Sequence, residues 1–163
     1  MSRYLLRPVG MLTALVFIGM AIQAAPLKPS IPAIQFTFDQ AGFDSVLAQW
    51  GPDGMARFRM HFAFDFPFLA CYGLFGYLLS RRTSLFLRFH AFASSLLAWI
   101  MPAAAAMDAA ENTLHLYFIS GATPILPDLY LIAGVIATIK WLLLAGFISS
   151  AAYAGAPGAY AAR

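Results

Sequence analysis

Four long apolar runs constrain the fold of this chain more than any other feature. Each has about the twenty residues that a helix needs to cross the hydrocarbon core of a bilayer. Only 10% of the 163 residues are charged, whereas soluble domains carry about 25% charged residues. The sequence therefore predicts an all-α fold, a four-helix transmembrane bundle forming a single domain over residues 1–163. We expect the helices over residues 9–25, 60–80, 88–118 and 128–150.

The first apolar run has two interpretations. Arg3 and Arg7 precede it and small residues end it, which is also the pattern of a secretory signal peptide. Ile22 and Gln23 are poor choices for the small residues expected before a cleavage site. We therefore expect a retained first helix, with a cleaved signal as the alternative.

The distribution of charge predicts the orientation of the bundle. Lys and Arg in short loops favour the cytoplasmic side of a membrane. With the N-terminus inside, six basic residues lie in the cytoplasm: Arg3, Arg7, Arg81, Arg82, Arg88 and Arg163. Three lie outside: Lys28, Arg57 and Arg59. We therefore expect both termini in the cytoplasm, which puts all seven acidic residues on the outer side or in the outer part of the bundle: Asp39, Asp44, Asp53, Asp65, Asp108, Glu111 and Asp128.

Composition also excludes several classes of protein. The ten basic residues are scattered between apolar runs and form no basic face, so nucleic acid is not an expected partner. The single cysteine, Cys71, excludes an internal disulfide framework and a multi-cysteine metal cluster. The lipid bilayer is the expected surrounding, with a membrane protein or a second copy of the chain as a further partner.

The loop between the first two runs contains an amphipathic segment at residues 39–50. Its apolar residues follow the i, i+3, i+4, i+7 spacing of a helical face: Phe43, Val46, Leu47 and Trp50. Such a helix next to a bilayer lies in the interface plane, with its apolar face toward the acyl chains. We expect a short amphipathic interfacial helix in the first outer loop, and a lid packed on the bundle is the alternative.

Ionisable side chains inside the apolar runs mark a candidate site. A charge at membrane depth costs from about 2.5 to more than 10 kcal/mol unless it is paired or faces water. On the third run, four polar residues fall within an arc of about 100°. The expected polar network comprises His61, Asp65, Asp108, Glu111, Asn112, His115 and Lys140.

Lys140 makes the sharpest structural prediction. It lies roughly 18 Å below the start of its helix, too deep to reach outer water. If the third helix stays in the membrane to about Phe118, Asp108 lies at nearly the same depth. We therefore predict a buried ion pair between Lys140 and Asp108. If that helix instead ends near Met107, Lys140 needs another partner.

The same polar residues suggest weak candidates for metal binding and catalysis. Imidazole and carboxylate groups suit zinc, manganese or iron, so a divalent metal is a minor possibility at His61, Asp65, Glu111 and His115. No His-x-x-x-His motif supports it, and no cofactor is predicted. If the site is catalytic, the candidates are Asp65, Asp108 and Glu111.

Several short motifs together resemble a set of small uncharacterised bacterial four-helix integral membrane proteins. These motifs are Trp50-Gly51-Pro-Asp-Gly54, Asp65-Phe-Pro, Asp108-x-x-Glu111-Asn112 in the third helix, and Lys140 in the fourth. The resemblance covers about residues 36–148. It supports the architecture and the choice of residues, and it carries no known activity. We expect the chain to lie in a bacterial inner membrane.

Three functions are consistent with these features. The leading hypothesis is a non-enzymatic membrane protein that binds lipid or a partner, or acts as an accessory subunit, with an outer-facing polar network. The alternative is a small membrane enzyme that acts on a lipid-soluble substrate through a carboxylate and histidine site. A third is a proton-coupled or ion-conducting oligomer, which requires the buried charges to face water.

Overall fold

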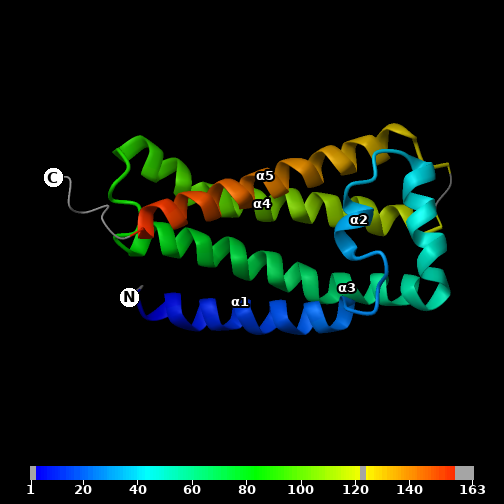
Figure 1. The fold of residues 1–163 in the computed structure, drawn as a ribbon, viewed down its shortest axis with the longest axis horizontal. Helices are drawn as coiled ribbons and strands as arrows, with labels where there is room; N and C mark the ends of the chain where they lie inside the picture. The colour runs from blue at the N-terminus through cyan, green and yellow to red at the C-terminus, as the bar shows by residue number, and fades with distance from the viewer. Residues whose placement is uncertain (1–2, 122–123, 157–163) are drawn as a thin grey trace.

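The computed structural model describes residues 3–121 and 124–156, and most of these residues are helical (Figure 1). Arg163, which was counted for the cytoplasmic side, lies outside them. Five helices follow one another along the chain: α1 (Arg3–Ala24), α2 (Ile31–Gln35), α3 (Gln40–Arg82), α4 (Ala91–Phe118) and α5 (Asp128–Gly155). The described residues contain no strand, so the predicted all-α class is confirmed for this part of the chain.

Four of these helices, α1, α3, α4 and α5, are long and apolar enough to cross a membrane. The largest difference from the predicted bounds is in α3, which begins at Gln40 rather than at residue 60, because it includes the amphipathic segment and the turns that follow Gly51. The other bounds differ by a few residues. α1 begins at Arg3 rather than at residue 9, and α5 continues to Gly155 rather than to 150. Hydropathy finds only the part of a helix that lies in hydrocarbon, because the polar turns beyond it contribute no apolar signal.

The predicted amphipathic segment forms the first part of α3. Asp39 caps this helix, because its carboxylate accepts a 2.7 Å hydrogen bond from the Gly42 amide. At Gly51 the backbone leaves the helical region (φ 63°, ψ −170°), which separates the segment from the long helix that follows. Glycine suits this position because a positive φ brings its backbone no steric penalty.

The apolar face of this segment packs onto the rest of the molecule. Phe43 is 1% exposed, and it joins Phe118 and Tyr130 in an aromatic cluster at the end of the bundle. Trp50 is also buried and donates a 2.7 Å hydrogen bond from Nε1 to the Pro29 carbonyl. The segment therefore covers this end of the bundle as a lid.

A short helix, α2, lies beside the lid and was not predicted. It begins at Ile31, with Pro32 in its first turn, and it is only five residues long. Proline suits the first turn of a helix because no intrahelical partner exists for its missing N–H. Ile34 is fully buried, so α2 inserts an apolar side chain among the long helices.

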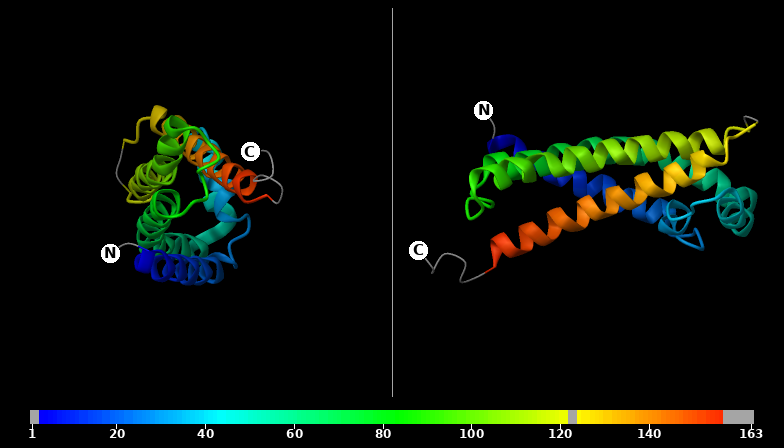
Figure 2. Two further views of the ribbon diagram at one scale, coloured as in Figure 1. Left: turned by 90° about the vertical axis from the view of Figure 1, so that its left-hand side faces the viewer. Right: turned by 90° about the horizontal axis from the view of Figure 1, so that it is seen from above.

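The long helices pack side by side in the order α1, α3, α4, α5 (Figures 1 and 2). Viewed end-on in Figure 2, they form an open arc rather than a closed ring. Within the described residues, no substantial packing joins α1 to α5, and only α2 and its flanking loops bridge that side. The start of α1 and the end of α5 lie at the same end of the bundle, opposite α2.

Close packing between α3 and α4 depends on small residues. Gly76 faces Met101, and a Cβ added to this glycine would lie 2.4 Å from the Met101 Cβ. Gly73 similarly faces Ala105, and Ala104 is fully buried. Small residues are how membrane helices approach closely without a hydrophobic driving force between them.

Candidate functional site

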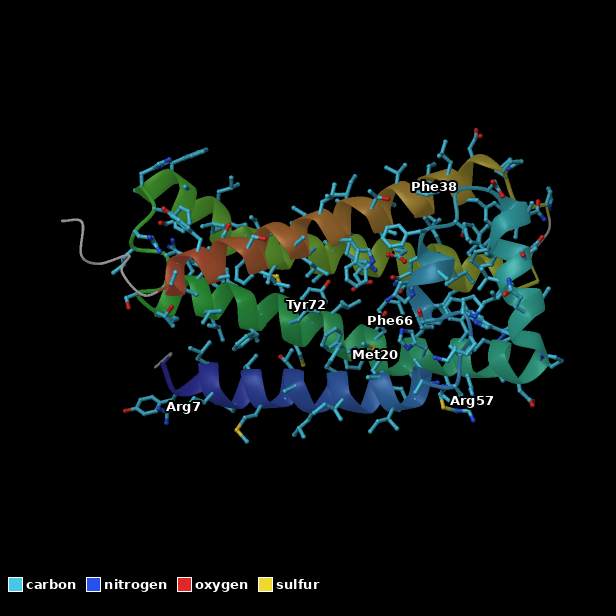
Figure 3. All side chains as sticks on the ribbon, in the orientation of Figure 1. Arg7, Met20, Phe38, Arg57, Phe66 and Tyr72 are labelled. Atoms are coloured by element: carbon cyan, nitrogen blue, oxygen red, sulfur yellow. The ribbon has the colours of Figure 1, made fainter. Side chains whose placement is uncertain are left out.

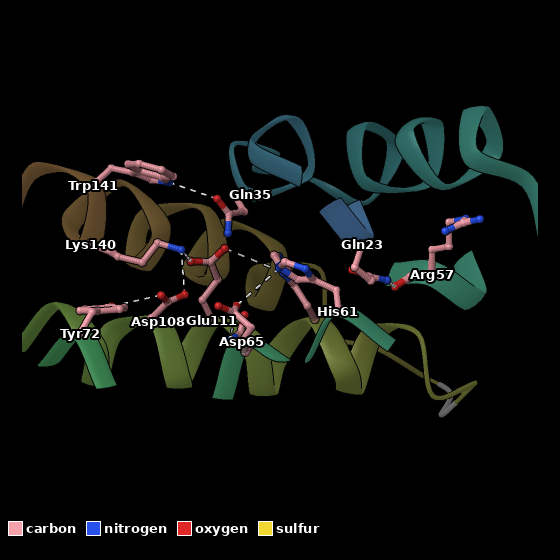
Figure 4. Close-up of polar contacts among 12 residues, drawn as sticks. Gln23, Gln35, Arg57, His61, Asp65, Tyr72, Asp108, Glu111, Lys140 and Trp141 are labelled. Atoms are coloured by element: carbon pink, nitrogen blue, oxygen red, sulfur yellow. Dashed lines mark hydrogen bonds and ion pairs between the residues drawn. The ribbon is translucent and has the colours of Figure 1, made fainter. Parts of the chain in front are cut away.

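A buried ammonium group lies between α5 and α4 (Figure 4). Lys140 of α5 is 2% exposed, and its Nζ lies 2.9 Å from Asp108 Oδ1 and 2.6 Å from Glu111 Oε2 of α4. The predicted Lys140–Asp108 ion pair is therefore present, and Glu111 is a second partner that was not predicted. One cation is shared by two carboxylates from neighbouring turns of one helix.

Residues of α3 complete the network from the other side of α4. The Tyr72 hydroxyl donates a 3.1 Å hydrogen bond to Asp108 Oδ2, and the Asn112 amide donates a 2.9 Å bond to Asp65 Oδ2. Both contacts are buried. Tyr72 was not singled out from the sequence, because a tyrosine in an apolar run gives no signal of its own. These bonds link α3, α4 and α5 through polar groups.

Two histidines each lie near a carboxylate four residues along the same helix. In α3, His61 Nε2 lies 3.7 Å from Asp65 Oδ2, and in α4, His115 Nδ1 lies 3.9 Å from Glu111 Oε1. Both distances exceed those of hydrogen bonds. The His115 ring packs against the ring of Phe43 of the lid. The structure therefore buries both imidazoles.

The periodicity of α4 explains why its polar residues converge. Asp108, Glu111, Asn112 and His115 follow the i, i+3, i+4, i+7 spacing of one helical face, and all four are buried. This face is turned toward α3 and α5, from which its hydrogen-bond and ion-pair partners come. All seven residues of the predicted polar network are buried in the structure.

A cavity of about 520 Å³ opens beside this network, on the side of the arc between α1 and α5. Met20 and Tyr72, both labelled in Figure 3, contribute to its wall. Its wall is largely apolar, and its polar residues include four members of the network: His61, Asp65, Asp108 and Lys140. Glu111, Asn112 and His115 do not line it.

At the cavity edge, α2 approaches α5. Gln35 of α2 accepts a 3.1 Å hydrogen bond from Trp141 Nε1 of α5, and both residues line the cavity. His61 also lines it and is 5% exposed, and its Nδ1 has no hydrogen-bond partner among the described residues. A buried ring nitrogen without a partner costs free energy, so this atom is suited to form a hydrogen bond with a bound molecule.

The chemistry of the cluster is that of a hydrogen-bonding site. It contains three carboxyl groups, one ammonium and two imidazoles. Among the described residues, no group of three or more His, Cys, Asp or Glu side chains is arranged to hold a metal ion. The candidate catalytic residues Asp65 and Asp108 line the cavity, whereas Glu111 does not line it and pairs with Lys140, which does.

A scan against protein-family models, a search of curated proteins and a search of solved structures each found no match to this chain. The function is therefore inferred from the cavity and the buried network themselves.

Proposed function

We propose that this chain is a non-enzymatic membrane protein that binds a lipid-soluble molecule with a polar end in the cavity between α1 and α5. The observation that carries this proposal is the cavity itself, whose largely apolar wall ends at buried polar groups. Ligand pockets combine an apolar lining with a few placed polar groups, and they measure about 300–1,000 Å³. The volume of about 520 Å³ lies within that range.

The apolar wall fits a hydrocarbon chain. Phe17 and Met20 of α1 face the cavity from one side, and Leu144 and Ile148 of α5 face it from the other. Because α1 and α5 lack substantial mutual packing, the space between them is a route by which a molecule dissolved in the bilayer enters sideways. A water-soluble ligand gains nothing from such a route.

The polar end of the cavity fits a hydroxyl or amide group. The free Nδ1 of His61 accepts a hydrogen bond when the ring is neutral and protonated at Nε2. The Lys140 ammonium has three donors, and its ion pairs with Asp108 and Glu111 account for two of them. A ligand that both donates and accepts hydrogen bonds, such as a long-chain alcohol, satisfies both groups.

The proposal also states in which membrane the protein lies and how it is oriented there. We infer a bacterial inner membrane with both termini in the cytoplasm, supported by the excess of arginines at one end of the predicted topology. The lid at 40–50 then lies at the outer interface. α1 exposes a broad apolar face, including Met11 and Leu15, that suits lipid, a partner helix or a second copy of the chain.

Co-purification tests the proposal. Ala21 lines the cavity, whereas Ala14 lies on the same helix outside it. In Ala21→Trp the indole fills the cavity, so we expect this variant to lose the amphiphile that wild-type protein retains through detergent washing, as measured by mass spectrometry of organic extracts. Ala14→Trp is the matched control and retains it. Identical extracts from all three proteins contradict the proposal.

A second candidate is chemistry on the bound molecule. One observation favours it: the carboxyl groups of Asp65 and Asp108 lie at the polar end of the same cavity. A catalytic acid or base must lie within hydrogen-bond reach of the bound substrate. Incubating the purified protein with a bacterial lipid extract tests this function. A new product that appears with wild-type protein and is absent with Asp108→Asn supports an enzyme, and identical extracts support binding alone.

A further inference from the structure

A second cavity lies at the other end of the bundle, between the start of α1 and the end of α3. It measures about 630 Å³ and is lined by six residues: Tyr4, Leu6, Arg7, Arg82, Thr83 and Ser84. It shares none of these residues with the cavity described above. Figure 3 labels Arg7 at this end of α1, far from Met20.

The charge of this second cavity is entirely positive. Arg7 and Arg82 are exposed, and neither forms an ion pair within the described residues. None of the six lining residues is acidic. Arg7 and Arg82 lie 75 positions apart in the sequence and both line this cavity, so an anion bound there is attracted by two positive charges.

Hydroxyl groups supplement the two guanidinium groups. The Thr83 hydroxyl already donates to the Leu79 carbonyl and accepts from the Leu85 amide. The hydroxyl groups of Tyr4 and Ser84 form no hydrogen bond within the described residues, so they are available as donors. Arginine forks bind phosphate oxygens in a bidentate manner, and hydroxyl donors fill the remaining lone pairs.

The surface next to this cavity distinguishes a lipid from a free anion. Three large apolar residues of α1 that follow Arg7 in the chain are at least half exposed: Met11, Leu12 and Leu15. An acyl chain that runs along this helix from a headgroup at Arg7 covers such side chains. A soluble phosphate bound at Arg7 leaves these side chains uncovered.

We propose that this cavity binds the phosphate of an anionic phospholipid, with the headgroup between Arg7 and Arg82 and an acyl chain along α1. Basic pockets between membrane helices recognise anionic headgroups in this way. The proposal does not depend on the ligand of the central cavity, because the two cavities lie at opposite ends of α1 and share no residue.

Native mass spectrometry of the full chain tests the site. The protein is titrated with phosphatidylglycerol or with phosphatidylcholine, and bound lipid is counted. We expect wild-type protein to prefer phosphatidylglycerol, and Arg7→Gln/Arg82→Gln to weaken that binding by roughly tenfold to thirtyfold. Arg57→Gln is the control for the loss of one positive charge, since Arg57 is also exposed but lies at the other end of the molecule.

Three results overturn the proposal. One is equal binding of the two lipids by wild-type protein. Another is the same loss of binding free energy per charge removed in Arg57→Gln and in the double variant, which shows an effect of net charge alone. The third comes from inorganic phosphate: if phosphate alone raises the melting temperature as much as phosphatidylglycerol does, the site binds a free anion and not a lipid. Because all three arginines are exposed, unchanged circular dichroism is expected for every variant.

Discussion

Lys140 Nζ of α5 lies 2.9 Å from Asp108 Oδ1 of α4, across 32 positions of sequence. The same nitrogen lies 2.6 Å from Glu111 Oε2, one turn further along α4. All three side chains are buried in a helix bundle whose surface is apolar enough to face lipid. This arrangement ties α4 to α5 beside the central cavity and sets the charge at its polar end.

Removing the cation should destabilise the bundle strongly. Lys140→Met leaves two buried carboxylates without their counter-charge, and breaking a buried ion pair from one side costs about 3–5 kcal/mol. Asp108→Asn should be milder, since Glu111 still pairs with the ammonium. Thermal unfolding in detergent measures both effects.

A compensating variant separates charge from packing. Lys140→Met/Asp108→Asn/Glu111→Gln removes all three charges, and we expect it to recover most of the stability lost in Lys140→Met. Lys28→Met, at an exposed lysine, controls for the change of residue type. If Lys140→Met and the triple variant have equal melting temperatures, the ion pairs do not determine the stability of the bundle.

The bond between Asn112 and Asp65 should also contribute to stability. Asn112→Ala removes the donor to Asp65 Oδ2 and leaves a buried carboxylate without it. We expect a loss of about 1–2 kcal/mol, because model-peptide studies give that range for hydrogen bonds between membrane helices and the carboxyl group left behind is buried. The neighbouring Thr113→Ala is the control, since Thr113 is exposed and bonds only to the Ala109 carbonyl. A smaller loss for Asn112→Ala than for Thr113→Ala rules out this contribution.

Helix packing at Gly76 gives a prediction independent of charge. In Gly76→Ala the new methyl group meets the Met101 side chain, and overpacking of this kind costs about 1–3 kcal/mol. Gly146→Ala is the control, because nothing lies within 4 Å of a Cβ placed there. Thermal unfolding should show a loss for the first variant and none for the second. The reverse order contradicts the packing of α3 on α4.

Much of the fold is predictable from the sequence because the bilayer limits the possible solutions. The four apolar runs correspond to α1, α3, α4 and α5, and the largest difference is the start of α3, which lies 20 residues before the predicted one. The polar face of α4 was predictable too, since an angle of about 100° per residue aligns Asp108 with Glu111 and His115. Depth alone then placed Lys140 level with Asp108.

Other parts of the site depend on tertiary structure that no local pattern encodes. The pairing of Lys140 with Glu111 depends on how α5 crosses α4, and the role of Tyr72 depends on the rotation of α3. α2 is too short for a periodic signal, so the hydrogen bond that Trp141 donates to Gln35 was not predicted. The cavity results from the distance between α1 and α5, which helix lengths do not determine.

Photolabelling tests the central claim most directly, namely that a lipid-soluble molecule occupies the cavity between α1 and α5. The probe is a long-chain alcohol with a diazirine on its terminal carbon, irradiated with the protein in bilayer nanodiscs and mapped by mass spectrometry. We predict saturable adducts on the residues that line the cavity from both helices, and their loss in Ala21→Trp. The predicted sites are Phe17, Met20, Leu144 and Ile148.

The opposite pattern contradicts the claim. Phe92 and Leu96 are exposed on α4 and do not line the cavity, so they report contact with bulk lipid. Adducts concentrated on these two residues, with the same yield in wild-type protein and in Ala21→Trp, show that the probe meets only the outer surface of the bundle.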